Sequence, residues 1–269
     1  MKAVLGIKCI LNTKCIIDMK KPRIISFANH KGGVGKTTTT ATVASILAEM
    51  GYVVMAIDVD AQANLTASLL EEETEESIYY ALTGKAKELP VIHISKNLDL
   101  VPSSLALAMA ELEMSSAISR EKILAGLIEP LKDKYDFILI DCAPSLALLT
   151  LNAITASNEI IIPLLAEVLP FKGLTMINDF IETVRTKLNP EAHVTGILLT
   201  RWENSKLSQK IEEGLRSQLG SLVFKTKIRK NIRVAEAPMV SENIMKYAPK
   251  SNGAQDYKAF VDELLAILA

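Results

Sequence analysis

A glycine-rich segment at residues 29–38 carries the residues best suited to chemistry. Two lysines, Lys31 and Lys36, enclose three glycines, and threonines follow the second lysine. Glycine allows backbone angles closed to other residues, so main-chain N–H groups can approach phosphate oxygens without a Cβ in the way. The apolar run Arg23–Ala28 precedes the segment, and helix-forming residues follow it. A strand, a glycine-rich turn, Gly-Lys-Thr and a helix form the context of a phosphate-binding loop.

Each part of this loop has an expected role in binding a nucleoside triphosphate. Lys36 is expected to reach the β- and γ-phosphates, and the Thr37 hydroxyl to ligate Mg²⁺. The first turn of the helix adds unpaired N–H groups and a positive dipole end. The ordinary motif has its first glycine where this chain has His30, and this chain adds Lys31. A surface lysine beside a turn is the alternative, which we disfavour because a lysine in a tight anion loop is costly unless its charge is used. The predicted nucleotide-binding residues are Lys31, Gly32, Gly33, Val34, Gly35, Lys36, Thr37 and Thr38.

Three aspartates come at the ends of apolar runs. Asp58 and Asp60 end one run, and Asp141 follows the four apolar residues Phe137–Ile140. Ligands of open α/β sheets bind at the carboxyl ends of the strands, so these side chains are expected near the phosphate loop. Asp141 has the pattern of a Walker B acid that holds Mg²⁺ through water. Either Asp58 or Asp60 could instead cap a short helix that begins near Asn64.

Apolar runs alternate with segments of helical period along the chain. The runs are rich in Ile, Val and Leu, as in parallel strands buried on both faces. The alternation predicts βα units and hence a single-domain α/β P-loop NTPase, with a mostly parallel sheet and helices on both faces. We expect strands at Arg23–Ala28, Tyr52–Ile57, Phe137–Ile140, Glu159–Pro163 and Val194–Leu199. We expect helices at Lys36–Met50, Ser103–Met114, Arg120–Leu131, Phe171–Leu188, Lys206–Leu219 and Ala254–Leu268.

Composition limits the classes of protein. The 269 residues, 49% hydrophobic and 23% charged, suit one globular domain. The net charge of -1 means that affinity for nucleic acid must come from a local patch. No apolar run reaches the roughly 18 residues of a bilayer span. The 3 cysteines are too few for a disulfide framework, and no structural metal site is evident. Residues 1–20 are interpreted as an arm or an over-extended start, with the domain at 21–269.

The run Lys31-Gly32-Gly33-Val34-Gly35-Lys36-Thr37-Thr38 resembles the deviant Walker A motif of the ParA/MinD family of P-loop ATPases. The resemblance covers nearly the whole chain after residue 20 and is ParA-like in the C-terminal third. It implies ATP with Mg²⁺ as the nucleotide and a homodimer that forms on ATP. It implies that Lys31 crosses the dimer interface to the partner's ATP.

The resemblance also assigns the acids after the second strand. The family pattern Asp-x-Asp-x-Gln matches residues 58–62 and implies that Asp60 polarises the attacking water. Asp58 then supports the Mg²⁺ shell or the loop. No arginine finger is visible, so slow intrinsic turnover is expected. The catalytic residues so predicted are Lys31, Lys36 and Asp60, and the metal-binding residues are Thr37, Asp58 and Asp141.

A basic run, Lys225–Arg233, stands out against the nearly neutral chain and contains no acid. A solvated surface is the ordinary interpretation of such a run. The resemblance to ParA instead implies binding of double-stranded DNA without sequence preference, and a ParB-type centromere-binding protein as the activating partner. It further implies a cytoplasmic, nucleoid-associated protein with no membrane partner. The DNA-binding residues implied are Lys206, Lys227, Lys230 and Arg233.

Three rival functions share the phosphate loop. A MinD-like membrane ATPase would end in a basic amphipathic helix, but residues 256–269 carry acids on the polar side, which favours a helix packed on the core. An iron–sulfur reductase needs two cluster cysteines per subunit, and only Cys142 follows the N-terminal arm. A biosynthetic ATP-dependent enzyme of the same superfamily stays open.

Overall fold

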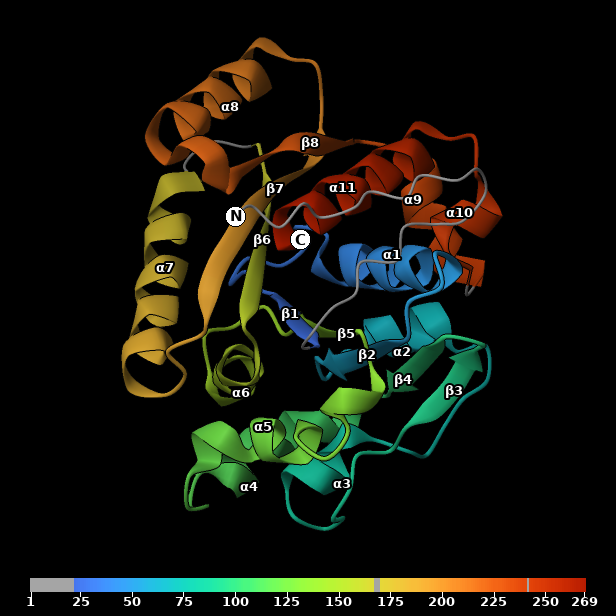
Figure 1. Cartoon of the computed structure of the whole chain (residues 1–269), viewed down its shortest axis with the longest axis vertical. Helices are drawn as coiled ribbons and strands as arrows, with labels where there is room; N and C mark the ends of the chain where they lie inside the picture. The colour runs from blue at the N-terminus through green and yellow to red at the C-terminus, as the bar shows by residue number, and fades with distance from the viewer. Residues whose placement is uncertain (1–21, 167–169, 241) are drawn as a thin grey trace, which may run out of the picture.

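The centre of the molecule is one sheet whose strands lie in the order β3-β4-β2-β5-β1-β6-β7-β8 (Figure 1). The computed structural model describes residues 22–166, 170–240 and 242–269, so the arm predicted at residues 1–20 lies outside the described residues. Neighbouring strands are parallel, except that β3 and β4 form an antiparallel hairpin. The predicted fold class is confirmed. The strands are β1 Arg23–Phe27, β2 Val54–Val59, β3 Ile92–Ser95, β4 Leu98–Val101, β5 Phe137–Cys142, β6 Glu159–Leu165, β7 His193–Trp202 and β8 Val223–Arg229.

The central strands are mostly apolar because they contribute side chains to two separate cores. In β1, Ile25 and Phe27 belong to the core on one face of the sheet. In the adjacent β5, Ile138 and Ile140 belong to the core on the other face. Successive side chains of a strand point to opposite faces, so burial of both faces requires an unbroken apolar run.

Helices cover both faces of the sheet, as predicted. Residues of α1 and α11 share a core with β1, and the two helices lie side by side in Figure 1. Residues of α5, α6 and α7 join the opposite core. The helices are α1 Lys36–Glu49, α2 Asn64–Leu69, α3 Ile78–Leu82, α4 Ala110–Met114, α5 Ile123–Ile128, α6 Leu148–Ala156, α7 Pro170–Lys187, α8 Lys206–Leu219, α9 Ile232–Glu236, α10 Ile244–Tyr247 and α11 Asn252–Leu268.

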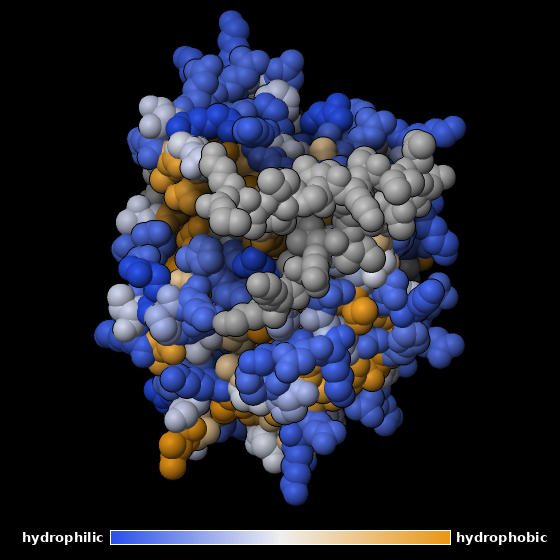
Figure 2. All heavy atoms as spheres, viewed as in Figure 1, coloured by the Kyte–Doolittle hydropathy of each residue, from blue (hydrophilic) through white to orange (hydrophobic). Residues whose placement is uncertain are grey.

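The C-terminal helix α11 packs on the core, as its acidic polar side predicts. Its acids bind the edge strand β8: Asp256 accepts hydrogen bonds from the Arg229 guanidinium, and Glu263 accepts from two backbone N–H groups of β8. Among the described helices, none combines the length and the apolar content needed to cross a bilayer. The face shown in Figure 2 is largely hydrophilic, with hydrophobic side chains in small separate groups. The apolar side chains of α11 are buried: Tyr257, Phe260, Val261, Leu264, Leu265 and Leu268.

Several elements differ from the sequence prediction. The basic run forms the edge strand β8 and the short helix α9, and neither the β3–β4 hairpin nor α6 was expected. The predicted helix Ser103–Met114 is a 3-10 segment, Leu105–Met109, that continues as α4. Helix α5 ends at Ile128, two residues before Pro130, because proline cannot continue the helical hydrogen-bond ladder.

Candidate nucleotide site

The phosphate loop joins β1 to α1 and needs glycine at two positions. Gly33 and Gly35 have φ angles of 72° and 86°, a region that side-chain-bearing residues avoid. Gly35 is the N-terminal cap of α1, so the first N–H groups of a 14-residue helix face the loop. The hydroxyl of Thr200, near the end of β7, donates to the carbonyl of Val34 at 2.7 Å. This bond anchors the loop to the sheet.

The two lysines of the loop sit in different environments. The Lys36 side chain is buried, and its Nζ donates to the backbone carbonyl of Lys31 at 3.3 Å. Burial lowers the pKa of Lys36, against the opposing charge of Asp141. Lys31 is an exposed residue. One lysine is thus enclosed by the loop, and the other lies at the surface beside it.

Asn29 holds the start of the loop, although the sequence did not single it out. Its amide donates to the carbonyl of Pro163 at 2.7 Å, and its Oδ1 accepts from the backbone N–H of Lys31 at 3.0 Å. A polar residue directly after a buried strand and before the lysine was the available signal. Asn29 ties the loop to β6 and orients the backbone before Lys31.

Asp141, the last but one residue of β5, has a carboxylate suited to a cation. It is fully buried, and neither oxygen has a hydrogen-bond partner of good geometry among the described residues. Burial raises the pKa of Asp141 well above its ordinary value, and the charge of Asp58 adds to this, while the Thr37 hydroxyl and Lys36 oppose it. A buried carboxylate of this kind is stabilised by a cation. Mg²⁺ commonly takes one or two protein oxygens and leaves the rest to water and phosphate, so Asp141 and Thr37 fit it.

Asp58 and Asp60 have different surroundings at the end of β2. Both Asp58 oxygens are engaged: Oδ1 accepts from the Asp60 N–H, and Oδ2 accepts from the N–H and hydroxyl of Thr66. Burial raises the pKa of Asp58 to about 6. Asp60 is half-buried, and its Oδ1 accepts from the Gln62 N–H. Asp58 therefore organises its own loop and α2, whereas Asp60 lies nearer the surface.

Cys142, next to Asp141, is a buried residue, as expected from the sequence. Burial raises the pKa of its thiol to about 12. The thiolate is the reactive form of cysteine, so this side chain is chemically inert at neutral pH.

The predicted DNA-binding side chains lie near the β8 edge, and two of the exposed ones form ion pairs. Lys206 begins α8 and is exposed. Lys230 pairs with Glu203 at 2.6 Å, and Arg233 pairs with Glu236 at 2.8 Å. The basic run contains no acid of its own, but other parts of the fold supply carboxylates to it.

Lys227 is held more firmly than these cations. Its Nζ lies 2.6 Å from Glu212 of α8 and 3.9 Å from the centroid of the Trp202 ring. The Glu212 side chain is only 14% exposed, so the pair is partly shielded from solvent. Lys227 therefore links β8 to α8 and the end of β7.

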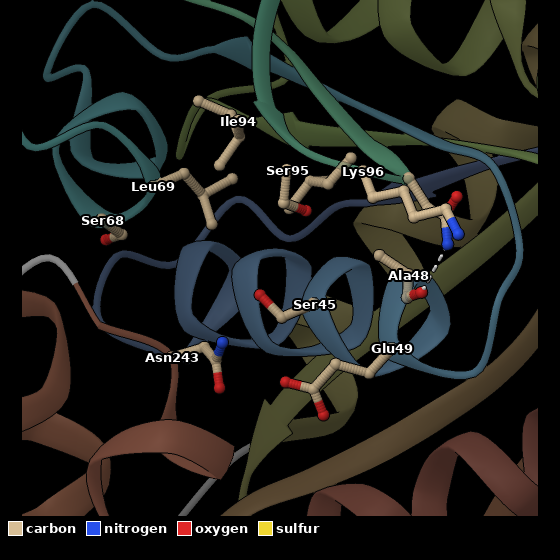
Figure 3. Close-up of a pocket in the computed structure, with 11 residues that line it drawn as sticks. Ser45, Ala48, Glu49, Ser68, Leu69, Ile94, Ser95, Lys96 and Asn243 are labelled. Atoms are coloured by element: carbon tan, nitrogen blue, oxygen red, sulfur yellow. Dashed lines mark hydrogen bonds between the residues drawn. The ribbon is translucent and has the colours of Figure 1, made fainter.

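A separate hollow of about 420 Å³ lies at the opposite end of α1 from the phosphate loop (Figure 3). Ser45 and Ser68, which line it, donate to carbonyls of their own helices. The Asn97 amide donates to the Ala48 carbonyl, marked by a dashed line in the figure. These three polar side chains of the hollow are therefore used in holding the fold.

The fold and the site together define a P-loop nucleoside triphosphatase, and comparison with known proteins specifies it further. The sequence family described as an AAA domain matches residues 22–194. The sporulation initiation inhibitor protein Soj of Bacillus subtilis is 37% identical over 249 residues, which cover 91% of this chain and 98% of that protein. The chromosome-partitioning ATPase Soj of Thermus thermophilus is 38% identical over 248 residues, 91% of this chain and 96% of that protein. The chain belongs to the Soj/ParA family of partition ATPases.

Solved structures agree with the fold and with ATP as the nucleotide. A plasmid partition protein of Borrelia burgdorferi bound to AMPPNP superposes with a TM-score of 0.79 at 26% identity, covering 91% of this chain and 99% of that one. A cobyrinic acid a,c-diamide synthase of Mycobacterium smegmatis, with an ATP analogue and magnesium, gives 0.79 at 30% identity, covering 91% and 94%. The protein is an ATPase whose nucleotide is ATP with Mg²⁺.

Proposed function

We propose that this protein is a DNA-partitioning switch driven by ATP. Two copies bind each other around ATP, and the dimer holds double-stranded DNA without sequence preference. Hydrolysis, stimulated by a ParB-type centromere-binding partner, releases the DNA. The similarity to chromosome-partitioning relatives supports this cycle and a cytoplasmic, nucleoid-associated location. The useful free energy is the difference in DNA affinity between the nucleotide states.

The observation that carries the proposal is the contrast between the two loop lysines. Lys36 is enclosed and neutralises phosphate within its own subunit. Lys31 is exposed, and its backbone is fixed on both sides by Asn29 and Lys36. A single-subunit ATPase needs only Lys36. Lys31 lies at the surface, where it can reach the nucleotide of a second copy.

The remaining site residues have roles in hydrolysis under this proposal. Thr37 and Asp141 hold Mg²⁺, with Asp58 supporting them through the loop that it organises. Mg²⁺ neutralises charge on the phosphates when it is bound. Asp60 is half-buried near the loop and orients the attacking water, a role usually worth about 10²–10⁴-fold in rate.

DNA binding is assigned to Arg233, Lys230 and Lys206, with Lys227 as the fourth member. The first three are exposed, and phosphate oxygens could replace the carboxylates that now pair with Arg233 and Lys230. Exposed ion pairs contribute little to stability, so this exchange costs little. Lys227, held by Glu212 and Trp202, contributes least.

Retention on DNA tests the proposal. Wild-type protein is expected to bind a nonspecific duplex with Mg-ATP and to lose it with ADP. Lys31→Ala is expected to bind ATP but neither dimerise nor retain DNA, since loss of one partner of a buried charge contact costs about 2–5 kcal/mol. Lys134→Ala is the matched control, an exposed lysine just before β5, at the far end of that strand from Asp141. If Lys31→Ala responds to ATP like the control, the dimer mechanism is wrong.

A second candidate is favoured by one comparison. The 30% identity to the cobyrinic acid a,c-diamide synthase structure supports a biosynthetic, amide-forming use of ATP. Such an enzyme would hydrolyse ATP only with an acid and an amine donor present, and would not retain DNA. The same retention assay therefore separates the two functions.

A further inference from the structure

His30 occupies the loop position where an ordinary phosphate loop has glycine. Its ring is half-buried, and its Nδ1 is buried without a hydrogen-bond partner among the described residues. Buried polar atoms are nearly always paired, so the place of this ring is not set by hydrogen bonding at Nδ1. The contact that the structure shows for the ring is with α7.

The packing partner is Gly173, in the first turn of α7. A Cβ built on Gly173 would lie 2.5 Å from Cε1 of His30 and 3.2 Å from Nε2. Real Cβ atoms essentially never approach another heavy atom to 2.5 Å, so the ring occupies space that the Cβ of any other residue at position 173 would need. Gly173 has an ordinary helical φ angle, so this space, and not backbone freedom, is what requires glycine here.

This contact completes the restraint on Lys31. The Lys31 N–H donates to Asn29, and its carbonyl accepts from Lys36. Residue 30, the remaining link between Asn29 and Lys31, is held by its ring against α7. We propose that His30, seated on Gly173, is a positioning residue for Lys31 and couples that lysine to the start of α7. The inference rests on the proposed function for the role of the Lys31 amine, but not for the placing of its backbone.

The rate of trypsin cleavage after Lys31, in monomeric protein without nucleotide, measures how readily the backbone opens at that residue. Gly173→Ala pushes the ring away, and His30→Ala removes it. Either variant is expected to raise the cleavage rate at Lys31 by about tenfold, because local opening becomes easier. His30→Ala introduces no clash, so it keeps the test decisive if Gly173→Ala fails to fold.

Gly126→Ala is the matched control. Gly126 is a helical glycine of α5 whose added Cβ meets nothing within 4 Å. The Gly126→Ala variant is expected to be cleaved at Lys31 at the wild-type rate or slightly more slowly. Its melting temperature is expected to equal the wild-type value or to be slightly higher. Equal cleavage in the wild type, His30→Ala and Gly173→Ala would overturn the inference.

The double variant tests whether the two residues act through one contact. If they do, adding Gly173→Ala to His30→Ala changes the cleavage rate by less than about twofold, since the ring that clashes is gone. A double variant whose effect equals the product of the two single effects would show independent action and would overturn the inference.

Dimerisation with ATP, followed by analytical ultracentrifugation, separates this inference from the proposed function. His30→Ala and Gly173→Ala are expected to weaken the dimer by about tenfold while changing the affinity for a fluorescent ATP analogue less than about threefold. Lys31→Ala reports on the function itself. If Lys31→Ala dimerises normally, the proposed function fails while the cleavage result still decides the inference. If only Lys31→Ala fails to dimerise and cleavage is unchanged, the inference alone fails.

Discussion

Asp58 of β2 and Asp141 of β5 are register partners on neighbouring parallel strands, yet only Asp58 has its oxygens hydrogen-bonded. The difference follows from what comes after each strand. The chain after Asp58 turns back into α2, which brings the Thr66 N–H and hydroxyl to its carboxylate. Asp141 faces the phosphate loop without such a partner. Two acids at one level of the sheet therefore differ: Asp58 holds the fold, and Asp141 keeps its oxygens available for the cation that we propose.

Removal of the Asp141 charge is expected to stabilise the protein without Mg²⁺. Folding buries this acid without a hydrogen bond of good geometry, and burial outweighs the opposing Thr37 hydroxyl and Lys36 charge, so Asp141→Asn should raise the free energy of unfolding by about 1–3 kcal/mol in EDTA. The same variant should lose the gain in ATP affinity that Mg²⁺ confers. Urea unfolding and nucleotide titration, each with and without Mg²⁺, check both effects. Asp133→Asn, at an exposed acid, controls for net charge. An unstable Asp141→Asn protein that keeps the Mg²⁺ effect would contradict the assignment.

The Thr66 hydroxyl is expected to matter for stability. It donates to Asp58 and accepts from the N–H of Ser103, so Thr66→Val leaves a buried donor unpaired. A loss of about 1–3 kcal/mol in the free energy of unfolding is expected. Thr83→Val removes only bonds from a hydroxyl to carbonyls of the preceding helix and should cost less. Equal losses in the two variants would show that Asp58 does not depend on Thr66.

The phosphate loop was predictable because its parts are adjacent in the chain. Residues 31–38 carry the glycines, lysines and threonines in one run, and the conformations of Gly33 and Gly35 follow from local backbone chemistry. Asp141 was predictable for a similar reason, because an acid ending an apolar strand must lie at the edge where the loop lies. Local pattern and strand polarity are enough for these residues.

The anchors of the loop were not predictable in this way. The Asn29–Pro163 bond spans 134 residues and the Thr200–Val34 bond spans 166. The first bond depends on β6 lying beside β1, and the second also depends on β7 lying beside β6. The alternation of strands and helices does not specify that order. Strand β8 was missed because it is an edge strand that carries an exposed Lys225 and a half-buried Lys227, and such a strand lacks the apolar run of a central one.

Ionisation of Tyr257 is expected to destabilise the fold at high pH. Burial raises the pKa of its phenol to about 12, and its hydroxyl lies 3.1 Å from the Thr39 hydroxyl of α1. The folded protein therefore holds this proton more tightly than the unfolded chain, whose tyrosine titrates near 10. The contribution of Tyr257 to the free energy of unfolding is fully present below pH 10. It is lost as the pH rises through 12, which lowers the free energy of unfolding by up to about 3 kcal/mol. Urea unfolding between pH 9 and 12 measures the fall. Tyr257→Phe should show a shallower fall, and an unchanged slope would contradict this account.

Arg233 and Lys227 are expected to separate DNA binding from stability, although both belong to the same basic run. Arg233 is exposed, and its ion pair with Glu236 is open to solvent, so Arg233→Ala should weaken DNA binding and reduce the slope of log affinity against log salt by about 0.9. Lys227 lies over Trp202 and against Glu212, so Lys227→Ala should lower the free energy of unfolding by about 1 kcal/mol through the lost ring contact. Its salt slope should stay near the wild-type value. Fluorescence anisotropy with a labelled duplex at four salt concentrations, in Mg-ATP, measures the slopes. A larger loss of slope in Lys227→Ala than in Arg233→Ala would mean that DNA displaces Glu212 and that the proposed order of contacts is reversed.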